Sequence, residues 1–269
     1  MKHLSRIYTT LVMVFLYAPI AVMVVYSFNA SRSTSVFGGF SLKWYAELLN
    51  DSSTIEALEN TLVLAVLSSV IATILGTLSA VGIFSMKKKW TKTAAMTVTN
   101  IPMMNPDIVT GISLMLLFVF VGQMVGSGNS LGFGTMLIAH ITFNLPYVIL
   151  SVLPKLRQTD HHLAEAAQDL GCTPFAAFFK VILPSIMPGV FSGLMMAFTL
   201  SLDDFVISYF TTGPDFQTLP IKIFSMTKRR VTPDMYALST LIFLSVLLLL
   251  ILSNVAQAKS EKRREGVKV

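Results

Sequence analysis

Four acidic residues lie inside long apolar stretches of this sequence, and their carboxylates are the groups there that could bind a charged ligand. They are Glu59, Asp107, Asp203 and Asp204, and no Lys or Arg lies in the same stretches. A carboxylate in the hydrocarbon of a bilayer is costly, so each such residue is a candidate for function. Because these charges are all negative, a path lined by them would favour a cation.

Asp107 follows two prolines, Pro102 and Pro106, in the segment TNIPMMNPDIV. Prolines interrupt helices, and an interrupted membrane helix frees backbone groups that must face protein or water. Transporters place such breaks beside the substrate path. Two roles stay open for Asp107. It is either a ligand for a cation, or part of a cap in which Asn105 or Asp107 accepts the free N–H groups of the second half-helix.

Asp203 and Asp204 are consecutive in the segment LSLDDFVIS. On a continuous helix, neighbouring residues point about 100° apart, so the two carboxylates face different directions. We expect Asp203 to bind the substrate and Asp204 to contact a neighbouring helix, with both belonging to the acidic path. The alternative is that one or both accept hydrogen bonds from a partner subunit or cap a helix break.

The composition indicates that membrane helices hold these residues. Of 269 residues, 54% are hydrophobic and 13% are charged, and the mean hydropathy of +0.70 is too high for a soluble domain of this size. A bilayer needs roughly 20 apolar residues per helix. We therefore predict an all-α integral membrane fold that forms one domain over residues 1–269. Six spans are expected near residues 8–28, 57–84, 94–121, 133–154, 189–210 and 235–257.

The distribution of basic residues predicts how these spans are oriented. The first span is longer than the apolar core of a signal peptide, about 7 to 15 residues, so we expect it to be retained. A cytoplasmic N-terminus places 14 of the 20 Lys and Arg residues inside, and the positive-inside rule then puts both termini in the cytoplasm. The triplet Lys228, Arg229 and Arg230 falls outside, as a solvated run or a partner contact. The net charge of +6 thus reflects topology and gives no reason to expect nucleic acid.

Two further patterns concern the membrane segments. Trp44, in FSLKWYAELL, is typical of an aromatic residue at the membrane interface; the alternative is a contact with substrate at the entrance to the path. In the second span, Ser68, Ala72, Gly76 and Ala80 recur every four residues. Small residues at this spacing let helices pack closely in lipid, so we expect this face to be structural.

The sequence has no motif for chemistry of its own. A phosphate-binding loop of the form GxxxxGK[ST] is absent from it, as are HExxH and GxSxG. Cys172 is the only cysteine, and the four histidines lack the spacing of metal ligands. We expect no catalytic residue, no metal and no cofactor, and any ATP that drives transport must bind a separate subunit.

Residues 155–188 form the long polar interruption of the second half of the chain. Small and apolar residues recur at helical spacing from Leu163 to Leu170, and Gly171 follows as a natural stop, so a short helix is predicted. Its alanines would let another surface approach closely. The alternative is a helical hairpin that packs only on its own bundle. The order of residues resembles the EAA loop of bacterial ABC importer permeases, with Val181 at the usual Ile position: Glu165, Ala166, Ala167, Gly171, Leu183 and Pro184 match.

Several segments together resemble one family more closely. NPDIV, AHITFNLPYV, EAAQDLG, FTLSLDDFVISYFTTGP and LPIKIFSM are similar to the C-type permease subunit of bacterial spermidine/putrescine ABC importers. The resemblance runs over most of the chain but not the tail after Ala258. It implies a six-helix permease in the cell membrane whose EAA loop couples to an ATPase.

The resemblance also implies partners. They are a homologous second permease, two copies of a cytoplasmic ATPase, an extracellular or periplasmic polyamine-binding protein, and the membrane lipid. One alternative is a permease for another small organic cation. A second is a secondary cation transporter, which would have no use for an EAA loop.

Overall fold

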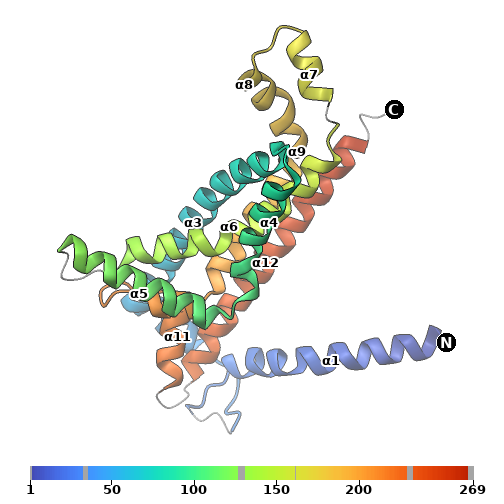
Figure 1. Ribbon diagram of the computed structural model, residues 1–269. Coiled ribbons are helices and arrows are strands. Elements are labelled where there is room, and N and C mark those ends of the chain that lie inside the picture. Colours follow the sequence, from blue (N-terminus) through green and yellow to red (C-terminus); the bar gives the residue numbers. More distant parts are fainter. Residues whose placement is uncertain (1, 33–35, 127–130, 161, 229–232, 266–269) are drawn as a thin grey trace. The chain divides into compact units, whose positions relative to one another are not determined.

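The fold is described by a computed structural model over residues 2–32, 36–126, 131–160, 162–228 and 233–265. Regular structure in these residues is helical, apart from an isolated bridge between Asn29 and Phe40 (Figure 1). The chain divides into two compact units: Met1–Leu58 with Leu219–Leu252, and Glu59–Thr218 with Ser253–Val269. The sequence-based expectation of one domain over residues 1–269 stays a prediction.

The first unit contains α1 (Lys2–Ser27), α2 (Lys43–Asn50), the beginning of α3 (Ser52–Ser85), α11 (Leu219–Thr227) and most of α12 (Pro233–Glu265). Its core joins residues that are far apart in sequence, from α2, α3, α11 and α12. They are Trp44, Leu48, Ala57, Leu219, Ala237 and Leu238.

A polar cluster fixes the start of α3 to α11 inside this unit. The Asp51 carboxylate accepts hydrogen bonds from the backbone N–H of Ser53 at 3.2 Å and from the Thr54 hydroxyl at 2.5 Å. The Lys222 ammonium, on α11, lies 2.7 Å from the same carboxylate and also donates to the Ser53 hydroxyl. Asp51 thus caps a membrane helix and holds a second helix to it.

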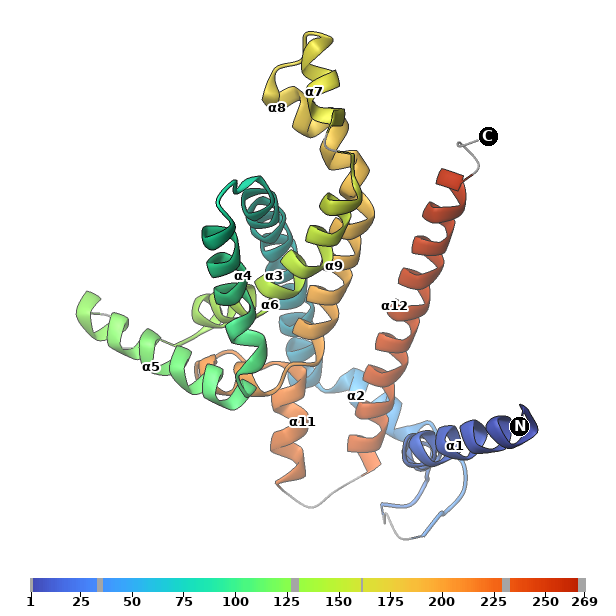
Figure 2. The same ribbon diagram turned by 45° about the vertical axis from the view of Figure 1, so that its right-hand side comes forward.

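The second unit is built on α3, α6 (Phe133–Gln158) and α9 (Leu183–Asp203), which share one hydrophobic core, and α6 packs along α9 (Figure 2). A Cβ added at Gly76 of α3 would come within 2.7 Å of the Val148 side chain of α6, so only glycine allows this approach. Ala72 and Ala80 are fully buried in the same contact. The structural role predicted for the small residues of the second span is therefore confirmed.

Among the residues that the structure describes, five helical segments are long and apolar enough to cross a membrane, and a shorter apolar segment, Pro233–Leu248, follows them. The five are Arg6–Ser27, Ser52–Ser85, Asp107–Val125, Phe133–Gln158 and Pro174–Asp203. The all-α membrane fold is thus confirmed. The third predicted span, 94–121, is interrupted as its prolines indicated, and it is divided between α4 (Lys89–Met104) and α5 (Asp107–Val125). The fifth predicted span, 189–210, is not one continuous helix, because it is interrupted after Asp203.

The division of the third span has a local cause. Asn105, the residue before Pro106, has an extended ψ of 140°. A residue that precedes proline is disfavoured in the α region, so α4 ends there and a new helix begins at Asp107. Pro102, by contrast, stays inside α4.

Candidate functional site

The consecutive residues Asp203 and Asp204 lie where the fifth predicted span is interrupted. Asp204 follows the last residue of α9 with φ −64° and ψ 125°, and the chain becomes helical again in α10 (Val206–Thr211). The Asp204 carboxylate accepts hydrogen bonds from the backbone N–H groups of Ser208 at 2.8 Å and Ile207 at 3.3 Å. It thereby satisfies N–H groups that a helix start would leave free in the membrane.

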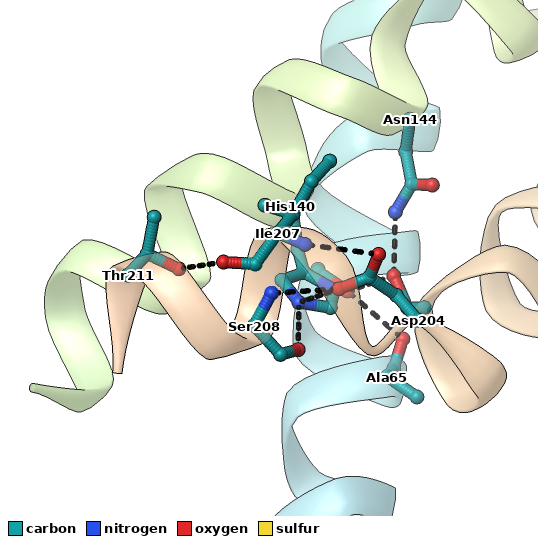
Figure 3. Close-up of polar contacts among 9 residues, drawn as sticks. Ala65, His140, Asn144, Asp204, Ile207, Ser208 and Thr211 are labelled. Atoms are coloured by element: carbon teal, nitrogen blue, oxygen red, sulfur yellow. Dashed lines mark hydrogen bonds and ion pairs between the residues drawn. The ribbon is translucent and has the colours of Figure 1, made fainter. Parts of the chain in front are cut away.

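The two neighbouring carboxylates have different surroundings as a result. The side chain of Asp204 is 7% exposed, and His140 of α6 approaches it, with Nε2 3.6 Å from Asp204 Oδ2 and 2.9 Å from the Ser208 hydroxyl (Figure 3). Asp203, at the end of α9, is exposed. The two residues do not lie on one continuous helix, because α9 ends at Asp203 and α10 begins at Val206. Within this chain, Asp203 is the one open to a ligand.

A chain of hydrogen bonds joins α6, α9 and α3 beside the break (Figure 3). The Asn144 amide of α6 donates to the Ser201 hydroxyl of α9 at 2.6 Å, and the two hydroxyls of Ser201 and Ser68 lie 2.9 Å apart. Since the Ser68 hydroxyl donates to the Ala65 carbonyl at 3.3 Å, Ser201 is left to donate to Ser68. This order gives Ser201 a donor and an acceptor partner, as a buried hydroxyl requires.

Asp107 lies at the first position of α5, where its carboxylate is exposed. Within the described residues its side chain forms no hydrogen bond, so a capping role for it has no support in this structure. α5 packs against α10: a Cβ at Gly111 would lie 3.0 Å from the Phe210 ring. Asp107 therefore begins a helix that adjoins the break, while Asp203 and Asp204 lie at the break itself.

Trp44 is placed differently from what the sequence suggested. Its side chain is 4% exposed in the core of the first unit, and its indole N–H donates to the Asn29 carbonyl at 2.6 Å. A ring enclosed in this way has no face for lipid headgroups or for a substrate. The residue was misjudged because its burial depends on α11 and α12, which lie far along the chain.

The polar loop 155–188 is largely helical and precedes α9. It contains α7 (His162–Asp169), α8 (Pro174–Ala177) and the π-helix η1 (Phe178–Ile182), and Figures 1 and 2 show α7 and α8 beyond the ends of α6 and α9. Gly171 has φ +87°, and Cys172 N–H donates to the Ala167 carbonyl at 3.1 Å, a left-handed helix ending that favours glycine. The short helix and its glycine stop are therefore confirmed.

The residues of the EAA pattern point in different directions. Ala167 is 8% exposed, on the face of α7 that packs against α8 and η1, whereas Glu165 and Ala166 are exposed. His162 lies 3.0 Å from Glu165, and this hydrogen bond raises the pKa of the imidazole. Glu165 and Ala166 are thus available to a partner, while Ala167 holds the loop together.

Leu183 and Pro184 mark the junction of the loop with α9. The Leu183 N–H donates to the Phe178 carbonyl, five residues earlier, which is the π-helical spacing. Pro184 has no N–H, and its ring crowds the carbonyl four residues before it. A wider turn relieves this crowding, so the proline accounts for the π segment. The pair therefore shapes the connection between the loop and the membrane helix.

Three exposed apolar residues of the loop were not predicted as functional. Leu170 is 88% exposed, Phe175 74% and Phe179 48%, and the rings of the two phenylalanines lie 4.6 Å apart. Large apolar side chains in an otherwise polar loop were the signal in the sequence. Exposed apolar groups that gather on one projecting segment are typical of a surface for another protein.

Other candidate groups are isolated. No group of three or more His, Cys, Asp or Glu residues that could hold a metal occurs in the part of the chain that the structure describes. Cys172 is a free thiol. Of the basic triplet, Lys228 lies over the Phe224 ring at 4.8 Å, while Arg229 and Arg230 are outside the described residues.

The chain is similar in sequence to membrane subunits of known transport systems. Residues 72–266 match the family described as the binding-protein-dependent transport system inner membrane component. The putrescine transport system permease protein PotI of Escherichia coli (strain K12) is 40% identical over 250 residues, which cover 93% of this chain and 89% of PotI. The spermidine/putrescine transport system permease protein PotC of the same strain is 39% identical over 259 residues, 96% of each chain.

Solved structures with a similar fold include a bacterial ABC transporter that imports the acidic polysaccharide alginate. Its matching chain gives a TM-score of 0.73 at 16% identity, over 95% of this chain and 94% of that one. A chain of the MetNI methionine ABC transporter gives 0.62 at 16% identity, over 76% and 94%. At such identities the likeness concerns the fold alone.

Proposed function

This chain belongs to the family of binding-protein-dependent transport system inner membrane components, and we propose that it forms half of the path through which an ATP-driven importer takes up spermidine and putrescine. It is a multi-pass membrane permease subunit and not itself an enzyme. The observation that carries the polyamine assignment is the exposed Asp203 carboxylate at the break after α9, in a membrane region without basic residues. The names of PotI and PotC support the same substrate class.

The substrate path uses charge attraction between carboxylates and the ammonium groups of a polyamine. Asp203 and Asp107 are the proposed ligands, and Asp204 supports the break from within the protein. Transport requires that the substrate also leave, so attraction from a few carboxylates in a hydrated path suits the task better than a dry, closed site. Trp44 is omitted from this path because its ring is buried.

The polar loop 155–188 is the proposed coupling loop. It docks on an ATPase at the cytoplasmic face, with both termini of the chain on the same side. Glu165 and Ala166 contribute the exposed part of α7, Ala167 and Gly171 maintain its shape, and Leu183 and Pro184 join it to α9. The partners are a homologous second permease, two ATPase copies that bind ATP, and a periplasmic or extracellular polyamine-binding protein. The chain needs no cofactor of its own.

The experiment is uptake of labelled putrescine and spermidine by cells that express the chain with its partners. Asp203→Asn keeps the shape of the side chain and removes its charge, so uptake should fall roughly tenfold or more, since a lost contact to a charged group costs about 1.5–3 kcal/mol. Asp107→Asn should act in the same direction. Glu47→Gln, in an exposed ion pair with Lys43, is the control for charge loss elsewhere and should leave uptake unchanged.

Two results would contradict the proposal. If Asp203→Asn and Asp107→Asn both transport at the wild-type rate with an unchanged half-saturation concentration, the carboxylates do not line the path. If unlabelled polyamines fail to compete with the labelled ones while another organic cation succeeds, the substrate assignment is wrong.

A further inference from the structure

Two side chains of α6 contact the two sides of the break between α9 and α10. Asn144 donates to Ser201, which lies in the last turn of α9. His140, one helical turn from Asn144, contacts the Ser208 hydroxyl and Asp204 on the α10 side. Both α6 side chains are at most 1% exposed. One face of α6 therefore spans the break and contacts each end of it.

The surroundings of the two ring nitrogens of His140 determine which nitrogen carries the proton. Nε2 faces two oxygen atoms, whereas the buried Nδ1 has no partner among the described residues. A neutral ring with its proton on Nε2 can donate toward the Ser208 hydroxyl and the Asp204 carboxylate. The other tautomer would leave an N–H group buried without an acceptor, which is costly.

α10 needs such support because it has only 6 residues. A helix this short is not stable by itself in isolation, so its position depends on the contacts that it makes. Asp204 caps it, and His140 holds both the cap and Ser208 against α6. Asp203 lies directly before Asp204, as the last residue of α9.

We propose that His140 and Asn144 are positioning residues, which hold the two ends of the break against α6 and so orient the carboxylate of Asp203. Their effect on transport rests on the proposed function, in which Asp203 binds the substrate. Their effect on the orientation of Asp203 does not depend on that function. Transport and orientation are therefore measured separately.

The first measurement follows orientation without transport. Cys172 is the only cysteine of this chain, so a Cys172→Ser, Asp203→Cys variant has a single thiol, at position 203. Its rate of reaction with a charged thiol reagent is followed by mass on this chain in the assembled complex. His140→Leu should change this rate by about fivefold, the effect of losing one buried hydrogen bond on an equilibrium. His140→Gln, whose amide nitrogen can take the place of Nε2, should restore the original rate.

The second measurement is uptake of labelled putrescine with Asp203 intact. His140→Leu should raise the half-saturation concentration about fivefold, with a smaller effect on the maximal rate, and His140→Gln should stay near wild type. Thr142→Val is the matched control, because Thr142 is exposed on the same helix and bonds only within it. It should change neither quantity.

The results separate the two proposals. An unchanged thiol reaction rate in His140→Leu, or a failure of His140→Gln to restore it, overturns the positioning role. Normal uptake by Asp203→Asn would instead overturn the proposed function of Asp203. If His140→Leu does not assemble, Ser208→Ala removes the same contact from the α10 side without altering α6, and the same two changes are expected.

Discussion

Asp203 and Asp204 differ in exposure although they are adjacent in sequence. The side chain of Asp204 is buried, its oxygens accept hydrogen bonds from two backbone N–H groups, and His140 approaches it. The protein itself therefore compensates the charge of this carboxylate. Asp203 remains exposed at the end of α9. Substitutions at the two positions should therefore have different effects. Loss of charge at Asp204 should destabilise the start of α10, which this carboxylate caps, whereas loss of charge at Asp203 should weaken the binding of the substrate.

A second residue-scale prediction concerns Asp51 and Lys222 in the first unit. The Lys222 ammonium, with the hydroxyls of Thr54 and Ser53, lowers the pKa of Asp51, although desolvation opposes the shift. A lowered folded-state pKa contributes stability above the unfolded value, about 3.9, and that stability is lost as the pH falls through the folded-state pKa. Lys222→Met should therefore lower the thermal midpoint in detergent at pH 7, and the difference should shrink below about pH 4.

The size of this effect and its control follow from exposure. The Asp51 side chain is 44% exposed, so solvent screens the pair, and we expect a loss of about 1 to 2 kcal/mol. Lys43→Met breaks an exposed pair with Glu47 and should cost under about 0.5 kcal/mol. Equal thermal midpoints for the wild type and Lys222→Met at pH 7 would show that the pair is not stabilising.

At the scale of elements, the coupling loop is a separate projection whose docking is testable at one residue. Ala166 is exposed on α7, so Ala166→Trp adds bulk to the outer face without disturbing the loop. ATP hydrolysis stimulated by the loaded binding protein should fall roughly fivefold or more, because overpacking a close contact costs about 1–3 kcal/mol. Ala166→Ser stays small and should retain stimulation. Normal stimulation in Ala166→Trp would remove α7 from the docking surface.

Two other positions in the loop are poor tests of docking. Ala167 faces α8 and η1, so a charge there would disrupt the loop itself. Gly171 has open space around its missing Cβ but a φ of +87°, so a larger residue there would strain the backbone. Loss of function in either case would report folding of the loop instead of its contact with the ATPase.

The sequence predicted elements well where their signals are local. Apolar length indicated an all-α membrane fold, and helical spacing with Gly171 indicated the short helix α7. The break after Asp203 was only an alternative in the sequence, because neither proline nor glycine marks it. It is held by the Asp204 cap and by His140, more than 60 residues earlier in the chain. Trp44 was misplaced for a similar reason, since its burial depends on distant helices.

At the scale of the whole molecule, this chain supplies only part of an importer. Its sequence contains one loop of the EAA pattern, and the proposed function assigns ATP binding to a separate ATPase subunit. Many apolar side chains of α5 are exposed on the isolated chain, among them Leu116, Phe120 and Met124. In a membrane, lipid or a second permease subunit would cover them. We therefore expect this chain to purify with a second permease and an ATPase.

The most direct test is transport in proteoliposomes by the complete complex. With the second permease, the ATPase and the binding protein present, labelled putrescine and spermidine should enter only when ATP is supplied on the ATPase side, and liposomes with this chain alone should show no uptake. Polyamine uptake by this chain alone, or a complete and ATP-hydrolysing complex that takes up neither polyamine, would contradict its assignment as half of a polyamine importer.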